Sequence, residues 1–154
     1  MSIFKKIFPC LYKPKESLQL SDYILDYYNQ PLTNELFALI NTHRVSIGSK
    51  PLEVFNAAKM EAYNHSVYML DTGEVSHDNS YNRSDILKDK GALRVAENSA
   101  YGYKGQGAKE ILNGLLNSEK HRIKLEDPQF THTGLSVATK NKIHSITQIL
   151  NTLK

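Results

Sequence analysis

The spacing of the hydrophobic residues changes along this chain, and that change limits the folds it can adopt. In the first half, five side chains recur at alternating steps of three and four residues and therefore share one helical face: Phe55, Ala58, Ala62, His65 and Met69. Near residues 93–97 and 135–150 the period falls to two, which is typical of half-buried strands. Helices followed by antiparallel strands predict an α+β layered fold.

The remaining elements are predicted from helix signals and turn residues. We expect helices at 21–29, from 33, at 53–70, 84–88 and 108–117, a loop at 102–107, and a terminal hairpin that turns at 140–142. Pro31 should end the first of these helices, and Thr33 should cap the second. In the strand that follows residue 92, we expect Leu93, Val95 and Glu97 to share the inner face, which would run from apolar side chains into a carboxylate.

Length and composition indicate one ordinary globular domain. The chain has 154 residues, of which 40% are hydrophobic and 23% charged, enough to bury one sizeable core. No apolar run approaches the roughly 20 residues of a membrane-spanning helix. The net charge of +3 lies in the first 16 residues, and the remainder is balanced. Because neutralising phosphates needs clustered Lys and Arg, we expect no nucleic-acid partner.

The first 20 residues are expected to form a basic leader or tether ahead of a domain at 21–154. Cys10 is the only cysteine, so we expect no internal disulfide. It follows a short basic and apolar run, the order found in bacterial lipoprotein signals, where the cysteine takes the lipid. The apolar run is far shorter than a standard signal core, and Pro9 is atypical. Two interpretations stay open: lipidation at Cys10, the only expected link to a membrane, or an incidental thiol.

Three short polar segments could share one site. They are Ser76-His77, Glu97-Asn98 and the run Ser118-Glu119-Lys120-His121-Arg122. Two imidazoles and a carboxylate can bind a divalent metal, since His₂Glu is an established zinc set, and they can also hold and move a proton. The segments lie far apart in the sequence, so only the fold can bring them together. None of the compact spacings that indicate zinc is present.

The order of these segments and their surroundings resembles the CAP superfamily of cysteine-rich secretory proteins, antigen-five allergens and plant pathogenesis-related proteins. The likeness is greatest to its small bacterial members. The matching pieces lie between residues 33 and 150: Ile40-Asn41-Thr-His-Arg44, Lys50-Pro51-Leu52, Ala62 to Met69 running into Ser76-His77, Arg83, Glu97-Asn98-Ser-Ala-Tyr-Gly102, Leu115-Leu-Asn-Ser118-Glu-Lys-His121-Arg122, Gly134-Leu-Ser-Val and Thr147-Gln148. Each piece alone is short, and their common order carries the resemblance.

The resemblance implies a three-layer α-β-α sandwich around a small central antiparallel sheet. It also implies that His77, Glu97 and His121 line one surface cleft, where the histidines of many members can hold zinc or another divalent metal. Further residues would support this cleft: Asn98, Ser118, Glu119 and Arg122.

Two departures from the family pattern bear on the cleft. Leu115 stands at the tryptophan position of the bacterial motif, and Ser118 stands where many eukaryotic members have a second glutamate. Glu119 is adjacent, but one residue along a helix turns a side chain by about 100°. The acidic half of the site is therefore incomplete, and Glu97 could instead orient a histidine by hydrogen bonding.

Catalytic serines are not indicated. Ser76, Ser99 and Ser118 lie near the motifs, but none sits in a nucleophile elbow. Ser136 falls in a near miss to Gly-x-Ser-x-Gly within a predicted strand that no helix follows, so we interpret it as an ordinary strand residue. His65, on the apolar face of its helix, is interpreted as a core residue.

The predicted function is therefore non-enzymatic: an extracytoplasmic protein, secreted or at the cell surface, that binds a protein partner or a small apolar ligand such as a lipid or sterol at or near the cleft. A metal-assisted, protease-like hydrolase using the same residues is the alternative. A surface adhesin or scaffold with a vestigial cleft is the third interpretation. If residues 1–10 are not a signal, the protein is instead cytoplasmic.

Overall fold

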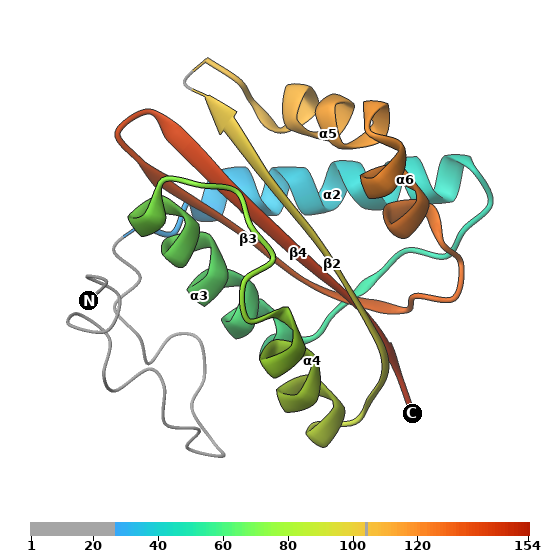
Figure 1. Cartoon of the computed structure of the whole chain (residues 1–154). Helices are drawn as coiled ribbons and strands as arrows, with labels where there is room; N and C mark the ends of the chain where they lie inside the picture. The colour runs from blue at the N-terminus through green and yellow to red at the C-terminus, as the bar shows by residue number, and fades with distance from the viewer. Residues whose placement is uncertain (1–26, 104) are drawn as a thin grey trace.

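The computed structural model describes residues 27–103 and 105–154 (Figure 1). The leader expected at 1–20, with Cys10, and most of the helix expected at 21–29 lie outside these residues. Residues 27–29 form a turn and an isolated bridge from Tyr28 to Ala138. Within the described part of the chain, no helix combines the length and apolar character needed to cross a membrane.

A four-stranded sheet forms the middle of the molecule. Its strands are β1 (Glu53–Val54), β2 (Ala92–Tyr103), β3 (His132–Lys140) and β4 (Ile143–Leu153), in the order β1-β3-β4-β2. β4 pairs antiparallel with both β2 and β3, and the predicted hairpin joins β3 to β4. The short β1 pairs parallel with β3, so the sheet is mixed, and the antiparallel sheet we expected is corrected at this edge.

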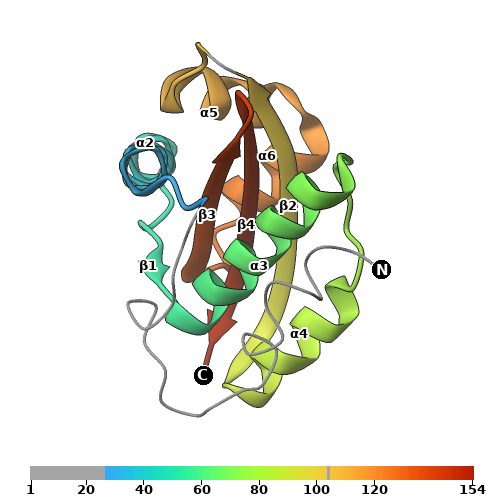
Figure 2. The same ribbon diagram turned by 90° about the vertical axis from the view of Figure 1, so that its left-hand side faces the viewer.

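Helices cover both faces of the sheet (Figure 2). α2 (Gln30–Ser46), α5 (Ala108–Asn117) and α6 (Glu119–Glu126) pack on one face, and α3 (Asn56–Thr72) and α4 (Ser80–Asp89) pack on the other. The predicted α+β class and the three-layer α-β-α sandwich are therefore confirmed.

The face under α2 and α5 holds the main hydrophobic core. Four aliphatic side chains of β3 and β4 point to this side and pack against the helices: Leu135, Val137, Ile146 and Leu150. Leu115 of α5, at the position where the resemblance implied tryptophan, is buried among them. Burying an aliphatic side chain of this size is worth about 1.5–3 kcal/mol, so this layer is a main source of stability.

The face under α3 combines small and hydroxyl-bearing side chains with a second, smaller apolar cluster around Ile149. Gly134 of β3 lies directly beneath Ala58, where an added Cβ would be 2.0 Å from the Ala58 carbonyl carbon. Further along α3, the Ser66 hydroxyl donates to Thr147 Oγ1 at 2.8 Å and to the Ser136 carbonyl at 3.3 Å. Glycine and alanine thus let α3 approach the sheet closely, and internal hydrogen bonds link the two layers.

Buried Arg44 at the end of α2 fixes the chain that leaves α6. Its guanidinium is fully buried and donates to four backbone carbonyls, those of Lys50, Leu125, Asp127 and Phe130. Burial lowers its pKa, although the charge of Asp127 acts in the opposite direction. Because one cation satisfies four acceptors, the position of α6, which carries His121, is set from within the core.

Several expected elements differ in extent. The first firm helix begins at Gln30 with Asn29 as its cap, so Pro31 lies in its first turn, where the missing N–H costs nothing. The helix expected from residue 53 begins at Asn56, after β1, and the expected helix at 84–88 is the longer α4. β2 continues to residue 103, into the segment expected to be a loop.

The expected inner face of β2 is wrong at its start. Leu93 is 54% exposed. The register of β2 against β4 shifts between Ala92 and Arg94. An irregularity of this kind changes the side to which a side chain points, so Val95 and Glu97 share a face that Leu93 does not.

Candidate functional site

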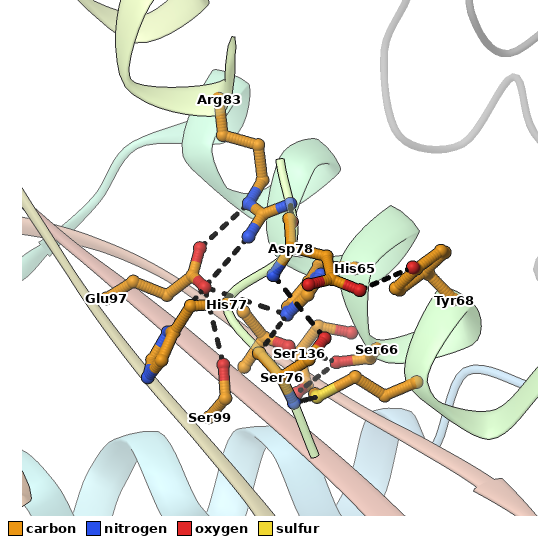
Figure 3. Close-up of polar contacts among 12 residues, drawn as sticks. His65, Ser66, Tyr68, Ser76, His77, Asp78, Arg83, Glu97, Ser99 and Ser136 are labelled. Atoms are coloured by element: carbon orange, nitrogen blue, oxygen red, sulfur yellow. Dashed lines mark hydrogen bonds and ion pairs between the residues drawn. The ribbon is translucent and has the colours of Figure 1, made fainter. Parts of the chain in front are cut away.

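The candidate site is built around the carboxylate of Glu97, which β2 holds at the edge of the sheet. Arg83 of α4 binds it in a two-pronged ion pair: Nε donates to Oε2 at 2.7 Å, and Nη2 donates to Oε1 at 2.8 Å (Figure 3). Both side chains are only 8% exposed. A bidentate pair shielded from water is among the strongest hydrogen-bonding arrangements in proteins, so the carboxylate is firmly placed.

His77 is the exposed member of the site. Its Nδ1 lies 3.0 Å from Glu97 Oε1, and its side chain is 46% exposed. Gly73 ends α3 in a left-handed conformation that glycine adopts readily, and the chain then turns back toward β2. Glu97 thus orients this histidine by hydrogen bonding, the second role considered for it above. A proton on Nδ1 leaves Nε2 as the nitrogen available to a partner.

His65 of α3 belongs to the site, although the sequence indicated only a core residue. It is 2% exposed, and its Nε2 lies 2.7 Å from the Ser76 carbonyl oxygen and 3.6 Å from Glu97 Oε1. A carbonyl only accepts, so Nε2 carries the proton. Burial lowers the pKa of His65, and the charge of Arg83 lowers it further. The charge of Glu97 and the hydrogen bond to the Ser76 carbonyl act in the opposite direction but do not outweigh these effects. The sequence signal was a histidine on an otherwise apolar helical face.

The segment that carries His77 is fixed at the residues on either side of it. On one side, the Ser76 carbonyl accepts from His65, as above. On the other, the Asp78 carbonyl accepts from Arg83 Nη1 at 2.7 Å, and the Asp78 carboxylate accepts from the Tyr68 hydroxyl at 2.6 Å. That hydrogen bond raises the pKa of Tyr68. Helices α3 and α4 therefore both hold the segment in place (Figure 3).

The charge state of Glu97 follows from these contacts. Burial alone would raise its pKa, but the hydrogen bonds and charge of Arg83, with smaller effects from His65 and His77, outweigh burial and hold the pKa below its usual range. Ser99 Oγ adds a long contact to Oε1 at 3.4 Å. The carboxylate is thus ionised at neutral pH and is a poor proton acceptor.

His121 lies in α6, beyond the edge of β2. Two hydrogen bonds hold α6 there: Lys124 Nζ donates to the Glu97 carbonyl at 2.7 Å, and Asn98 Nδ2 donates to the His121 carbonyl at 3.2 Å. Burial and nearby lysines lower the pKa of His121, whereas a hydrogen bond with the Ser99 backbone raises it by a smaller amount. Its Nε2 is buried, and no other described residue gives that nitrogen a hydrogen bond.

The structure joins His77 and Glu97 by a hydrogen bond, and His121 lies near them without a described hydrogen bond to either. Across residues 27–103 and 105–154, His121 forms no hydrogen bond or ion pair with either, although the charge of His77 contributes to its lowered pKa. The same residues contain no group of three or more His, Cys, Asp or Glu side chains placed to hold a metal ion. Arg83 donates to both oxygens of Glu97, so a metal ion could bind this carboxylate only by sharing those oxygens with the ion pair.

The predicted support residues have separate roles. Asn98 also donates to a side-chain amide of β4 at 3.2 Å. Ser118 precedes α6, and its carbonyl accepts two backbone hydrogen bonds from the first turn. Arg122 donates to a carbonyl of α5 at 3.1 Å. Glu119 is exposed in the first turn of α6, where its charge suits the helix dipole. These residues place α6 and do not add a second carboxylate to Glu97.

The serines near the motifs are not arranged as nucleophiles. Ser99 is 3% exposed, and its hydroxyl faces Glu97. The Ser76 hydroxyl accepts the Asp78 N–H at 3.4 Å. Ser136 is fully buried within β3, in agreement with its interpretation as a strand residue. Over the described ranges, no serine hydroxyl is hydrogen-bonded to a histidine, the contact that would activate it.

Comparison with known proteins identifies the family and the fold. The family model described as "CAP: Cysteine-rich secretory protein family" matches residues 37–150. A search of curated protein sequences gives no significant match.

Three solved structures are similar to this chain. An outer surface protein of Borrelia burgdorferi has a TM-score of 0.71 at 18% identity, covering 81% of this chain and 95% of that one. An extracellular SCP-domain protein of Bacillus anthracis has a TM-score of 0.65 at 28% identity, covering 79% of this chain and 40% of that one. A cysteine-rich secretory protein of Staphylococcus aureus has a TM-score of 0.64 at 20% identity, covering 80% and 39%. The last two proteins are thus much longer than the matched region.

Proposed function

The chain belongs to the cysteine-rich secretory protein (CAP) family, and we propose that it is a non-enzymatic, extracytoplasmic protein that binds a protein partner beside His77. The observation that carries the proposal is the engagement of Glu97 by Arg83 and His77. Arg83 fixes the buried carboxylate of Glu97, and Glu97 in turn fixes the exposed imidazole of His77. In this proposal the carboxylate has a structural role and does not react.

The protonation states favour binding over acid–base catalysis. A general base works best when its pKa lies near the working pH, whereas Arg83 keeps the pKa of Glu97 below its usual range. His65 is neutral and buried, and its Nε2 is committed to a backbone carbonyl. Of these three groups, only His77 reaches solvent to a large extent.

The binding surface would be the segment from Val75 to Tyr81. Val75 is 46% exposed, and Tyr81 at the start of α4 is 88% exposed, so two large apolar side chains flank His77 in sequence. Residues 76 and 78 are anchored to α3 and α4. A segment already held in one conformation loses little entropy on binding, and exposed aromatic side chains often dominate protein interfaces.

A metal-assisted hydrolase is the second candidate for this site. The Nε2 atoms of His77 and His121 are the imidazole nitrogens left over, because Glu97 engages His77 at Nδ1 and His121 Nε2 is buried without a described partner. The two could hold a divalent ion such as Zn²⁺ with Glu97 orienting His77. A bound ion would supply Lewis-acid activation of water. An adhesin or scaffold that makes no use of the cleft is the third candidate.

The extracytoplasmic location is proposed from the similar structures: the Borrelia protein is an outer surface protein, and the Bacillus protein is extracellular. A lipid on Cys10 would attach the domain to a membrane. Mass spectrometry of the native protein tests the anchor, because Cys10 found unmodified and still preceded by residues 1–9 would contradict it.

Competition binding tests the proposed surface. The labelled protein is bound to a cell-surface preparation from the source cells and displaced with unlabelled wild type, His77→Ala, Tyr81→Ser or Tyr103→Ser. Tyr103 is 59% exposed at the end of β2 and serves as the matched control. We expect His77→Ala and Tyr81→Ser to compete at least about tenfold less well, as hot-spot losses of 1.4 kcal/mol or more predict. Equal competition by all four proteins would contradict the proposal.

Two further measurements separate the alternatives. Turnover of peptide or ester substrates that depends on a divalent metal and disappears in His77→Ala would favour the hydrolase. Calorimetric titration with Zn²⁺ compares wild type with His77→Ala/His121→Ala, and equal binding by both proteins would exclude a metal held by these imidazoles. Copurification of an apolar molecule, seen by native mass spectrometry, would replace the protein partner with a small ligand.

A further inference from the structure

The outer edge of β3, on the side away from β4, is hydrogen-bonded on either side of Leu135 but not at Leu135 itself, which is 3% exposed. The Thr133 carbonyl accepts from the Phe55 N–H at 2.9 Å, where β1 ends. The Val137 carbonyl accepts from the Asn29 N–H at 2.8 Å, and the Val137 N–H donates to Thr33 Oγ1 at 3.1 Å. These segments therefore bond to the outer edge of β3 at Thr133 and at Val137, and Leu135 lies midway between the two positions.

The register of the sheet directs the Leu135 peptide groups into this gap. In an antiparallel ladder, alternate residues bond to the neighbouring strand and the others face away from it. Thr133 and Val137 face away from β4, and the pairing of β3 with β4 has no register shift, so Leu135 faces away as well. Within residues 27–103 and 105–154, neither its N–H nor its outward carbonyl has a hydrogen-bond partner.

A small open pocket lies at this point. Figure 2 shows α2 and β1 beside this outer side of β3. We call the pocket the edge notch, and its lining residues are Thr33, Asn34, Phe37, Val54, Lys59, Thr133 and Leu135. Phe37 and Val54 supply apolar surface, and Lys59 supplies a positive charge. A few polar groups set among apolar walls are the usual composition of a ligand site.

The size of the edge notch limits its ligand. The volume open to the centre of a water-sized sphere is ≈ 40 Å³, and on that scale one bound water needs about 10–15 Å³. The notch therefore takes a group of about three heavy atoms, such as a carboxylate. Along the strand, the two covering hydrogen bonds are four residues apart, or about 13 Å. A strand cannot pass through a gap closed at both ends, whereas a chain terminus can enter it.

We propose that the edge notch binds the C-terminal carboxylate of an extended peptide. The carboxylate would accept from the Leu135 N–H and lie near Lys59, while the Leu135 carbonyl would accept an N–H from the peptide. In this arrangement only the end of the peptide adds to the sheet edge. Main-chain hydrogen bonds provide affinity, and the charge of Lys59 selects the C-terminal carboxylate.

The charges around the notch favour an anion over the N-terminal amine of a peptide. Lys59 Nζ lies 5.4 Å from the centre of the Tyr28 ring and pairs with no acid among the described residues. Glu53, the acid next to Val54, is 81% exposed and lies 3.6 Å from His132. Glu53 does not line the notch, and Lys59 is the one charged side chain among the described residues that do.

Nuclear magnetic resonance of the ¹⁵N-labelled protein tests the proposal. The probes are the tripeptide acetyl-Ala-Val-Leu with a free C-terminal carboxylate and the same tripeptide as its amide. We expect the free acid to shift the Leu135 amide resonance with a Kd on the order of 1 mM, and the amide to bind about tenfold more weakly. Lys59→Gln should weaken the acid to the same extent, whereas Lys109→Gln, an exposed lysine of α5, should not.

Four results would overturn the proposal. They are no shift at Leu135 with 10 mM free acid, equal binding of acid and amide, equal loss in both lysine variants, and concentration-dependent shifts at Leu135 without peptide, which would assign the notch to a second copy of the chain. Hydrogen exchange checks the premise, because a Leu135 amide protected as strongly as that of Val137 would mean that the edge is closed. His77 does not line the notch, so we expect His77→Ala to leave peptide binding unchanged, and this proposal and the proposed function can fail independently.

Discussion

The two faces of the central sheet are built from different chemistry, although alternate residues of the same strands form both. In β4, Ile146 and Leu150 point to α2 and α5, while Ser145, Thr147 and Asn151 lie on the α3 side. Each face has one exception in this strand, Gln148 on the apolar face and Ile149 on the α3 side. The apolar face can be filled by any well-packed aliphatic set, but each buried hydroxyl or amide needs its own partner. The polar face is therefore the one that specifies geometry.

The candidate site lies on the polar face. Glu97 and Ser99 are on the same side of β2, and the partners of Glu97, His65 and Arg83, come from the two helices that cover that side. His121 belongs to the apolar layer and reaches only the strand edge. The comparison predicts that the apolar layer determines how stable the protein is, whereas the polar layer determines how precisely the site is held.

The largest expected effect concerns the close approach of α3 to the sheet. In Gly134→Ala the new Cβ would lie 2.0 Å from backbone carbon and 2.2 Å from backbone nitrogen of α3, so the whole helix must move. We expect a loss of about 4 kcal/mol or more in the free energy of unfolding, measured by urea denaturation. Gly114→Ala is the control, because nothing lies within 4 Å of its Cβ, and it should stabilise α5 by up to about 1 kcal/mol. A similar result for both variants would mean that α3 has room to move.

The next largest effect comes from breaking the buried ion pair. Arg83→Leu leaves Glu97 charged and buried, which costs about 3–5 kcal/mol when one partner of a buried pair is removed. Arg83→Leu/Glu97→Leu should recover most of that loss, because no charge is then left unpaired. Arg94→Leu is the surface control. Arg94 is 46% exposed, its ion pair with Asp127 is 3.5 Å long, and its other contacts are with the Gln129 side chain and the Phe130 ring, so we expect a loss of only about 1 kcal/mol. If the double variant is no more stable than Arg83→Leu, the loss in Arg83→Leu does not come from the unpaired charge of Glu97.

Neighbouring residues of β4 compare the two faces most directly. Ile146→Ala removes aliphatic volume from the main core and should cost about 3 kcal/mol, a typical value for such a truncation. Thr147→Val keeps the volume but removes the acceptor of the Ser66 hydroxyl, and should cost about 1 kcal/mol. We further expect Thr147→Val to broaden the resonances of His65 and Glu97 more than Ile146→Ala does. The opposite order of broadening would contradict the division of roles between the faces.

The sequence predicted what depends on local periodicity and missed what depends on register and long-range placement. The stripes of α3 and α5, the hairpin and the alternation in β3 are local patterns. The order of motifs predicted that His77, Glu97 and His121 line one cleft, and the structure shows His77 and Glu97 hydrogen-bonded to each other. The shift near Leu93 and the parallel pairing of β1 depend on partner strands. The role of His65 depends on where the loop after α3 returns, and nothing in the sequence near His65 records that.

The smallest expected effect is the pH dependence that Glu97 gives to the polar face. Its pKa in the folded protein is lower than in the unfolded chain, so at acid pH the unfolded chain binds more protons and stability rises with pH. The contribution is complete above the unfolded pKa of about 4.3 and is lost as the pH falls through the folded pKa. One such group changes the free energy of unfolding by at most about 1.4 kcal/mol per pH unit.

Urea denaturation at several pH values between 6 and 3 tests this contribution. Below pH 4.5, the free energy of unfolding should depend less steeply on pH in Glu97→Gln than in wild type. Ile146→Ala, altered on the apolar face, should keep the wild-type slope, and a Glu97→Gln slope equal to wild type would place the acid sensitivity in other carboxylates.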